Sequence, residues 1–162
     1  GGVDAGDDGE LDLVGVHLAQ HPELHAQLKA EPERVPAAVE EFLRLYTPYR
    51  GFARTANRDV EIGGRPIRAG EPIALVYASA NRDEAVFENP DAFILDRPNI
   101  KDHIAFGRGA HYCAGAALGR LQMRVLLEEL LSATSRLELA APPVMSPFPE
   151  LGPWQVRVKL HA

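Results

Sequence analysis

The feature that most constrains the fold is a glycine-rich loop that carries the single cysteine of the chain. The loop reads FGRGAHYCAG from Phe106 to Gly115 and leads directly into the longest predicted helix, over 114–132. Because the positive end of a helix and its free N–H groups stabilise an anion, Cys113 lies where a thiolate is favoured. The glycines let the backbone adopt positive φ or approach a ligand closely. The loop is therefore a candidate ligand site.

Other interpretations of this loop remain open on the residues alone. A lone cysteine is often a small buried hydrophobe, and a glycine-rich loop before a helix can also cradle phosphate. The segment lacks both the Gly-Lys-Ser/Thr ending of a P-loop and the GxGxxG spacing of a dinucleotide fingerprint. Arg108 and His111 flank the loop as candidate partners for carboxylates.

Composition narrows the class of protein. The 162 residues suit one domain, and 46% hydrophobic with 25% charged residues is typical of a globular chain. A net charge of −6 disfavours nucleic acid and anionic membranes as partners. No apolar run reaches the roughly 18 residues of a membrane helix. The single cysteine excludes an internal disulfide framework and, with the absence of an anchor, indicates a cytoplasmic protein with a reduced thiol.

Hydrophobic periodicity predicts an α+β chain in which helices dominate. Proline at Pro22 suits a first helical position, so one helix ends near Gln20 and another begins there. The further predicted helices cover 36–46 and 114–132, the latter with an apolar stripe of Ala114, Ala117, Leu118, Leu121, Val125 and Leu126.

The middle of the chain has a different texture. Predicted strands lie around the turns Gly63-Gly64 and Ala69-Gly70, in the run 73–78, and in the tail at 136–140 and 154–160. Between them, 80–104 is predicted to be a long ordered coil with one short helix near 81–86. Long loops inside compact domains are usually functional.

Three further features each have an ordinary interpretation when taken alone. Glu41 and Arg44 are spaced to pair on one helix face, as any surface ion pair does. Arg54, just before a strand, and Arg97, in the coil, can each be a solvated arginine. Order and spacing are what give these residues meaning.

Taken together, these features resemble the cytochrome P450 family of haem-thiolate monooxygenases, in its soluble bacterial form. Phe106, Gly109, Cys113 and Gly115 stand at the fixed positions of its Phe-x-x-Gly-x-x-x-Cys-x-Gly signature. AAVEEFLR resembles the K-helix ExxR motif, and ANRDEAVFENPDAFILDR resembles the meander. The resemblance covers about 16–140 and implies a mainly helical α+β portion of that fold, with J, K and L helices, a small β region, the meander and the Cys loop.

The resemblance also implies roles for individual residues. Cys113 would be the axial thiolate ligand of the iron of haem b, which pushes electron density toward the metal. Backbone N–H groups near Gly115 would donate to its sulfur. The remaining implied haem contacts are Phe106 and Gly107 beside the ring, and Arg54, His111 and Arg108 at the propionates. Glu41, Arg44 and Arg97 would form a buried structural triad.

The implied activity is insertion of one atom of O2 into a small organic substrate, with electrons from a ferredoxin or its reductase. Arg108, Arg120 and Arg124 are a candidate docking patch, or else ordinary solvated arginines. Nucleic acid and membrane are not expected partners. The whole chain, 1–162, is predicted to be the C-terminal portion of one such domain.

The beginning of the chain departs from the family pattern. Residues 1–10 are expected to be disordered or a remnant of the distal I helix, with Asp4 as the distal acid and Ala5 where threonine is usual. Two alternatives to an enzyme therefore stay open: a chain that binds haem without turnover, and a non-functional truncated remnant.

Overall fold

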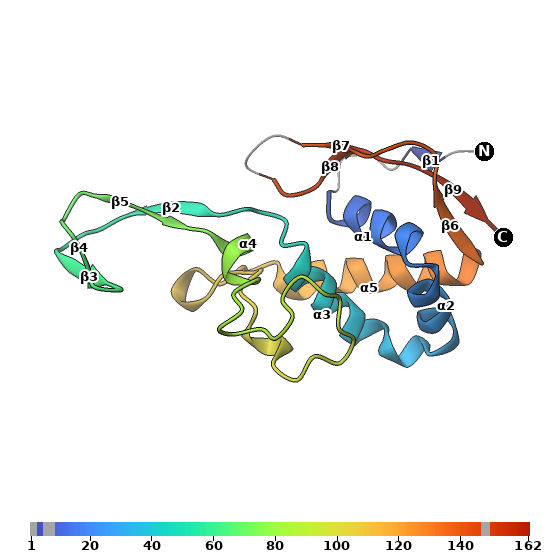
Figure 1. Ribbon diagram of the computed structural model, residues 1–162, viewed down its shortest axis with the longest axis horizontal. Helices are drawn as coiled ribbons and strands as arrows, with labels where there is room; N and C mark the ends of the chain where they lie inside the picture. Colours follow the sequence, from blue (N-terminus) through green and yellow to red (C-terminus); the bar gives the residue numbers. More distant parts are fainter. Residues whose placement is uncertain (1–2, 5–8, 147–149) are drawn as a thin grey trace.

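The computed structural model describes residues 3–4, 9–146 and 150–162. A helical body occupies the centre, and β ribbons extend from it (Figure 1). The helices are α1 (Gly9–Gln20), α2 (Pro22–Ala30), α3 (Val35–Leu45), α4 (Tyr77–Ala80) and α5 (Ala116–Ala133), with single 3-10 turns at Pro32–Arg34, Ile100–Asp102 and Gly109–His111. The mixed, mainly helical architecture confirms the predicted fold class.

The core forms where α3 meets its neighbouring helices. Phe42 and Leu28 are completely buried, and Leu127 of α5 is 2% exposed. The other core members come mainly from the same elements: Val14, Leu18, Leu24, Val35, Ala38, Val39, Leu43, Ala105, Met123, Leu131 and Leu137. Prolines at or next to the first helical position begin α2 and α3, because proline there removes no helical hydrogen bond. This confirms the predicted break at His21-Pro22.

Short antiparallel strands make up the β structure. β2 (Phe52–Thr55) pairs with β5 (Pro72–Leu75), and β3 (Val60–Ile62) pairs with β4 (Arg65–Ile67). Gly63 and Gly64 join β3 to β4 with φ values of 58° and 76°, a conformation that glycine adopts without strain. The predicted turn there is confirmed.

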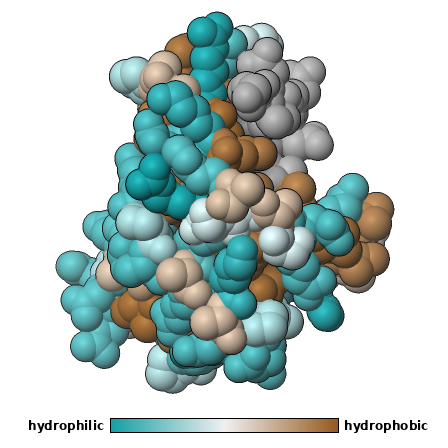
Figure 2. Space-filling view, turned by 90° about the vertical axis from the view of Figure 1, so that its right-hand side faces the viewer, coloured by the Kyte–Doolittle hydropathy of each residue, from teal (hydrophilic) through white to brown (hydrophobic). Residues whose placement is uncertain are grey.

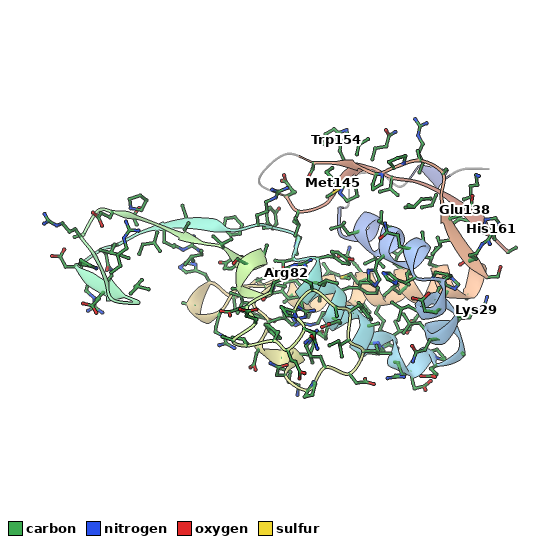
Figure 3. The ribbon with its side chains drawn as sticks, in the orientation of Figure 1. Lys29, Arg82, Glu138, Met145, Trp154 and His161 are labelled. Atoms are coloured by element: carbon green, nitrogen blue, oxygen red, sulfur yellow. The ribbon has the colours of Figure 1, made fainter. Side chains whose placement is uncertain are left out.

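The tail contributes two further pieces of sheet. β6 (Arg136–Leu139) pairs with β9 (Arg157–His161), and β7 (Val144–Met145) pairs with β8 (Pro153–Gln155). Figure 3 shows Glu138 beside His161 on the first pair, where Glu138 also accepts from Lys159 at 3.2 Å. At the end of the molecule where α2, β6 and β9 lie, hydrophilic side chains predominate and hydrophobic ones form separate patches (Figure 2).

The first residues do not continue a helix as far as they are described. Val3 and Asp4 form strand β1, which pairs antiparallel with Val158 and Arg157 of β9. The backbone of Asp4 is therefore extended, and the helical setting expected for a distal acid is not found. Residues 1–2 and 5–8, including Ala5, lie outside the described residues. Gly9 and Glu10 already belong to α1, so that helix begins two residues before the predicted start.

The helix predicted near 81–86 is wrong. The strand ends at Leu75, and the only helix nearby is the single turn of α4. Asp83 explains the difference, because its carboxylate accepts from the Ala85 N–H at 2.9 Å and competes with helical bonding. The segment that follows is a series of turns.

The apolar stripe predicted on α5 is not its packing face. Leu118, Leu121 and Val125 are 58%, 55% and 47% exposed, whereas the residues buried on this helix are Ala116, Met123, Leu127 and Leu131. Periodicity identified the helix correctly, but α5 is apolar on two sides and α3 covers the other one. None of the helices in the described residues combines the length and apolar character needed to cross a bilayer.

Candidate functional site

The Cys113 loop is a tight reversal that returns the cysteine to the start of the loop. The N–H of Cys113 donates to the Phe106 carbonyl at 2.9 Å, and the N–H of Gly107 donates to that of Ile104 at 2.8 Å. Gly107 and Gly109 have φ values of 74° and 76°, which L-residues with side chains rarely adopt. These two glycines are thus required for the path of the loop, and Cys113 ends up exposed beside Phe106.

Cys113 opens into a pocket of about 780 Å³, within the ~300–1,000 Å³ range of ligand sites. Five parts of the chain form its walls: the loop, α5, β2 with the segment before it, α4, and the segment just before β8. The lining residues are Pro48, Tyr49, Phe52, Arg54, Tyr77, Ala105, Phe106, Gly107, His111, Cys113, Gly119, Gln122, Met123, Leu126, Glu150 and Leu151. Four of the predicted cofactor-binding residues besides Cys113 therefore meet in one cavity: Phe106, Gly107, His111 and Arg54.

The lining combines an apolar, aromatic surface with two basic side chains and one sulfur. Arg54 donates to the carbonyl of Ala53 at 2.9 Å and, within the described part of the chain, forms no ion pair with a carboxylate. Its guanidinium can therefore accept an anionic ligand. Aromatic walls with a few convergent polar groups are typical of cofactor sites.

Two predicted contacts lie outside this lining. Arg108 is exposed on the loop, beyond the pocket walls. Gly115 follows the cysteine, and a Cβ added there would stand 3.7 Å from the Cys113 sulfur. That distance is ordinary van der Waals contact, so glycine at this position keeps the space next to the sulfur open.

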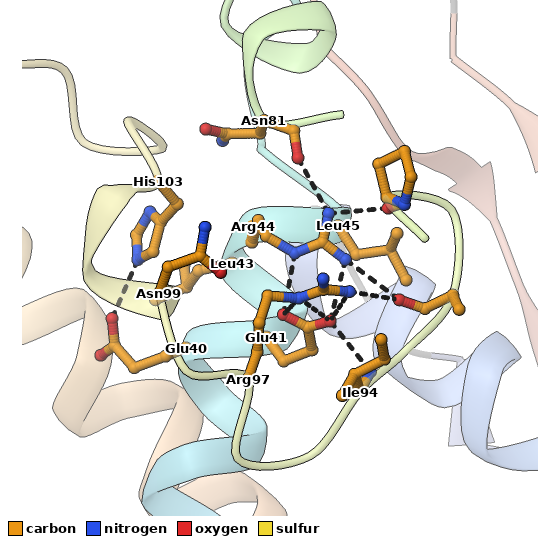
Figure 4. A network of polar contacts seen from close by, with 12 residues as sticks. Glu40, Glu41, Leu43, Arg44, Leu45, Asn81, Ile94, Arg97, Asn99 and His103 are labelled. Carbon is orange, nitrogen blue, oxygen red and sulfur yellow. Dashed lines mark hydrogen bonds and ion pairs between the residues drawn. The ribbon is translucent and has the colours of Figure 1, made fainter. Parts of the chain in front are cut away.

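The second cluster is built on Glu41 of α3, which is 1% exposed. Arg44 donates to both carboxylate oxygens at 2.8 Å, and Arg97 donates from Nη2 at 3.0 Å. The N–H of Ile94 adds a bond of 2.9 Å (Figure 4). The helix and the coil predicted to resemble the meander are therefore tied together through one buried carboxylate, and an ordinary surface ion pair is excluded for Glu41 and Arg44.

Backbone carbonyls complete the contacts of the two arginines. Arg44 donates to the carbonyls of Asn81 and Pro90 at 2.8 and 2.7 Å. Arg97 donates to those of Glu88 and Ala92. Burial acts to raise the pKa of Glu41, but hydrogen bonds from both arginines outweigh it, and the pKa lies below its ordinary value. The cluster is charged, satisfied and structural.

Sequence reasoning missed Asn81, which lies at the centre of this region and is completely buried. Its amide donates to Thr47 Oγ1 at 2.6 Å, and its Oδ1 accepts from the Ile104 N–H at 2.7 Å. It therefore connects the end of α3 to the segment that enters the Cys loop. In the sequence this asparagine stands at the start of the helix predicted near 81–86, and no signal marked it as buried.

The arginines of the predicted docking patch have carboxylate partners of their own. Arg120 pairs with Glu40 and Arg124 with Glu128 at 2.8 Å. These contacts offset the positive charge of α5, and Arg108 is the member of the patch that forms no ion pair with another described residue. The exposed side of α5 is therefore not a simple basic surface, as the predicted docking patch would require.

Comparison with known proteins identifies the family. The family model for cytochrome P450 matches residues 33–151. Cytochrome P450-terp of a Pseudomonas species is 44% identical over 129 residues, which is 79% of this chain and 30% of that protein. Nocardicin C N-oxygenase of Nocardia uniformis subsp. tsuyamanensis is 46% identical over 133 residues, 81% of this chain and 33% of its own length.

Solved structures agree with this assignment. Cytochrome P450-153 from Novosphingobium aromaticivorans superposes with a TM-score of 0.89 at 38% identity, covering 94% of this chain and 39% of that one. Mycobacterium marinum CYP150A6 in its substrate-free form gives 0.90 at 29% identity, covering 94% and 40%. The chain belongs to the cytochrome P450 family, and it spans about a third of the length of the curated relatives it matches.

Members of this family bind haem b, and the pocket has the chemistry for that group. A planar, largely apolar macrocycle with two carboxylates needs apolar walls, an axial donor and cationic groups at its edge. The pocket supplies Phe106 and Met123 as walls, Cys113 as donor, and Arg54 and His111 as cations or hydrogen-bond donors. The residues present therefore fit haem.

Proposed function

We propose that this chain is the cysteine-loop portion of a haem-thiolate monooxygenase in which Cys113 is the axial ligand of the haem iron. The observation that carries the proposal is the opening of Cys113 into the same pocket as Phe106, Arg54 and His111. A cysteine alone would not support the proposal. A thiol that shares a pocket with aromatic walls and basic side chains forms a site for a planar anionic cofactor. Bound haem supplies the redox chemistry that activates O2.

The residues of the chain hold and orient that group. The Phe106 carbonyl fixes the Cys113 N–H, so the sulfur is presented by a loop with a defined turn. Open space next to Gly115 leaves room for backbone N–H groups to approach the sulfur, which tunes the donor strength of a ligand. Phe106 and Gly107 line the same pocket as Cys113 and would flank a bound ring, where they would exclude water from the sulfur.

Two basic side chains are proposed to bind the carboxylates of the haem. Arg54 and His111 reach the pocket from β2 and from the loop, and charge-assisted bonds to the two propionates are the natural use for them. Arg108 is exposed on the loop and is proposed as a third, peripheral contact. The triad of Glu41, Arg44 and Arg97 is proposed to be structural, and none of the three lines the pocket.

The proposed reaction is insertion of one oxygen atom of O2 into a small organic molecule, with two electrons from a ferredoxin or its reductase. Family membership supports this class of reaction, and the relatives include a protein named as an N-oxygenase. Residues 1–162 are proposed to act as the C-terminal portion of one domain, in the cytoplasm. No role is proposed for Asp4, since its backbone is that of a strand.

An optical spectrum tests the proposal. The chain is expressed with haem, reduced and exposed to carbon monoxide, in parallel with Cys113→Ala and Cys113→Ser. A strongly red-shifted Soret band in the parent chain that is lost in both variants is the expected result. Haem binding with an unshifted band, or a shifted band that survives Cys113→Ala, would overturn ligation by Cys113.

Variants of the two basic residues test their contribution to haem binding. Arg54→Gln and His111→Gln are expected to weaken haem retention by roughly tenfold each, as loss of a charge-assisted bond does. Arg58→Gln, on the strand ribbon outside the pocket, is the matched control. Turnover is measured separately from haem binding. Consumption of O2 coupled to formation of an oxygenated product indicates an active enzyme, whereas the red-shifted carbon monoxide band without such product indicates haem binding without turnover.

A further inference from the structure

The side chain of Glu40 connects two elements that flank the Cys113 loop. Because adjacent residues of a helix project in different directions, Glu40 points away from Glu41. Its carboxylate accepts a separate set of hydrogen bonds. Its carboxylate, 26% exposed, accepts from His103 at 2.9 Å and from Arg120 of α5. Figure 4 shows the contact with His103, beside the buried cluster of Glu41. This one carboxylate therefore joins two branches of hydrogen bonds, one through His103 and one through Arg120.

The first branch reaches the beginning of the loop. Nδ1 of His103 accepts from the N–H of Ala105 at 3.2 Å, so Nε2 carries the proton that is donated to Glu40. Ala105 immediately precedes Phe106. The chain of bonds from Glu40 through His103 therefore fixes the backbone just before the loop.

The second branch reaches the end of the loop. Arg120 donates to Glu40 from Nε at 2.5 Å and from Nη2 at 3.0 Å, the two-pronged geometry of a guanidinium on a carboxylate. Its Nη1 donates to the hydroxyl of Tyr112 at 3.1 Å. Tyr112 is the residue directly before Cys113. The guanidinium that is held by Glu40 therefore also holds the residue next to the sulfur.

The same guanidinium packs on the aromatic residue of the loop. Its carbon lies 4.7 Å from the centre of the Phe106 ring, within cation–π range. The ring also lies edge-on to that of Tyr112, with the centroids 6.5 Å apart, and close to Gly119, where an added Cβ would stand 3.4 Å from Phe106. Phe106 is thus fixed between Arg120 and a glycine that leaves it room.

The loop itself has little regular structure to hold it. It contains one 3-10 turn, Gly109–His111, and Tyr112 and Cys113 are exposed. Exposed loops with few backbone bonds open at low free energy unless side chains tie them down. The contacts of Glu40 and Arg120 tie this loop to α3 and α5 at both of its ends.

We propose that Glu40 and Arg120 are positioning residues that hold the Cys113 loop in its ligating conformation, through His103 at its beginning and through Tyr112 and Phe106 at its end. The proposal rests on the proposed function in that Cys113 is taken as the ligand of haem. Neither residue is among those that line the pocket, so neither is expected to hold the cofactor directly. Their effect reaches the sulfur through the loop.

Amide hydrogen exchange on the full chain without haem is the first test. Glu40→Gln removes the charge that Arg120 binds, and Tyr112→Phe removes only the hydroxyl of a residue that is half-exposed. Both are expected to raise exchange at residues 106–113 by roughly tenfold, the effect of losing one charge-assisted bond. Arg124→Gln is the matched control, because Arg124 lies one turn further along α5 and also pairs with a carboxylate, Glu128.

Arg120→Lys separates charge from geometry. Lysine keeps the positive charge but has neither the fork that spans Glu40 and Tyr112 nor a plane to stack on Phe106. We expect loop exchange close to that of Glu40→Gln, with exchange in the core of α3 unchanged. Unchanged loop exchange in all three variants, or an equal rise in Arg124→Gln, would overturn the positioning role.

The second readout is the spectrum of the haem-loaded chain. In Glu40→Gln the fraction of bound haem with the red-shifted carbon monoxide band is expected to fall several-fold while total haem changes less. If the band resists Cys113→Ala, the proposed function fails whatever the exchange data show. If the band depends on Cys113 but not on Glu40 or Arg120, ligation stands and the positioning proposal fails.

Discussion

Arg97 and Glu41 form a buried ion pair across 56 residues of chain, with Nη2 of the arginine 3.0 Å from Oε1 of the carboxylate. Both side chains are at most 2% exposed. The pair fastens an otherwise irregular coil to α3. That coil leads on to the Cys113 loop, so the geometry of the site depends on this contact as well as on the loop itself.

Removing the shared carboxylate should cost much of the stability of the chain. We expect Glu41→Gln to lower the free energy of unfolding by about 3–5 kcal/mol, because two buried guanidinium groups lose their counter-charge. Glu138→Gln, on an exposed sheet pair, should cost much less, because exposed ion pairs contribute little to stability. Urea unfolding measures both, and equal effects in the two variants would contradict the structural role of Glu41.

The two apolar sides of α5 should differ in their contribution to stability. Leu127 is 2% exposed and Leu121 is 55% exposed on the same helix. Leu127→Ala is expected to destabilise by about 2–5 kcal/mol through lost burial and a cavity, and Leu121→Ala by about 0.5 kcal/mol or less. Denaturant unfolding of this pair is a direct check, since residue type and helix are matched. A larger loss in Leu121→Ala would mean that its side is covered in solution.

Two glycine-to-alanine changes, at Gly51 and Gly15, should change the stability of the chain in opposite directions. At Gly51 a Cβ would stand 2.2 Å from the carbonyl oxygen of Leu75, so backbone must move and the β2–β5 pair is expected to loosen. At Gly15 in α1 no atom lies within 4 Å of the added Cβ, and alanine should stabilise the helix by roughly 0.5–1 kcal/mol. Thermal melts of both variants test this, and a stable Gly51→Ala would contradict the close approach of the strands.

His17 should make stability depend on pH. It is 6% exposed, its Nδ1 lies 2.7 Å from the Tyr46 hydroxyl, and burial, aided by repulsion from His21, lowers its pKa to about 4. The unfolded chain takes up this proton near pH 6.5 and the folded chain only near pH 4. Stability is therefore full above pH 6.5 and falls as the pH drops to about 4, by up to about 3 kcal/mol.

The contribution of His17 is isolated by a difference measurement. His17→Gln does not titrate, so the loss of stability between pH 7 and pH 4.5 should be smaller than in the parent chain. Other groups titrate in both proteins and cancel in the comparison. Urea unfolding at the two pH values gives the result, and identical pH dependence would show that another group is responsible.

Local patterns were sufficient for much of the fold. Proline at the start of α2, paired glycines between β3 and β4, and the 3.6-residue period of α5 all act through neighbours in the chain. For that reason they were readable before any tertiary contact was known. Five of the residues that line the pocket were also predicted: the cysteine loop was a candidate ligand site from its own residues, and the haem-contact roles of Phe106, Gly107, His111 and Arg54 came from the family resemblance.

Contacts between distant segments could not be read in the same way. Asn81 carries no sign of burial in the sequence, yet it is enclosed by its hydrogen bonds to Thr47 and Ile104. The outward side of α5 has the pattern of a core face, but α3 covers the other side. Glu40 and Arg120 stand 80 residues apart and carried no shared signal. Nothing in the alternation of apolar and polar residues records which polar side chains will meet.

The sequence by itself determined the four longer helices, most of the turns, the cysteine loop and the family, because each depends on local geometry or on a short ordered motif. The tertiary structure decided which side of α5 is buried, that Asn81 is enclosed by Thr47 and Ile104, and that Glu40 fastens both ends of the loop. These are choices between surfaces and partners of similar local chemistry, and only packing in three dimensions makes them.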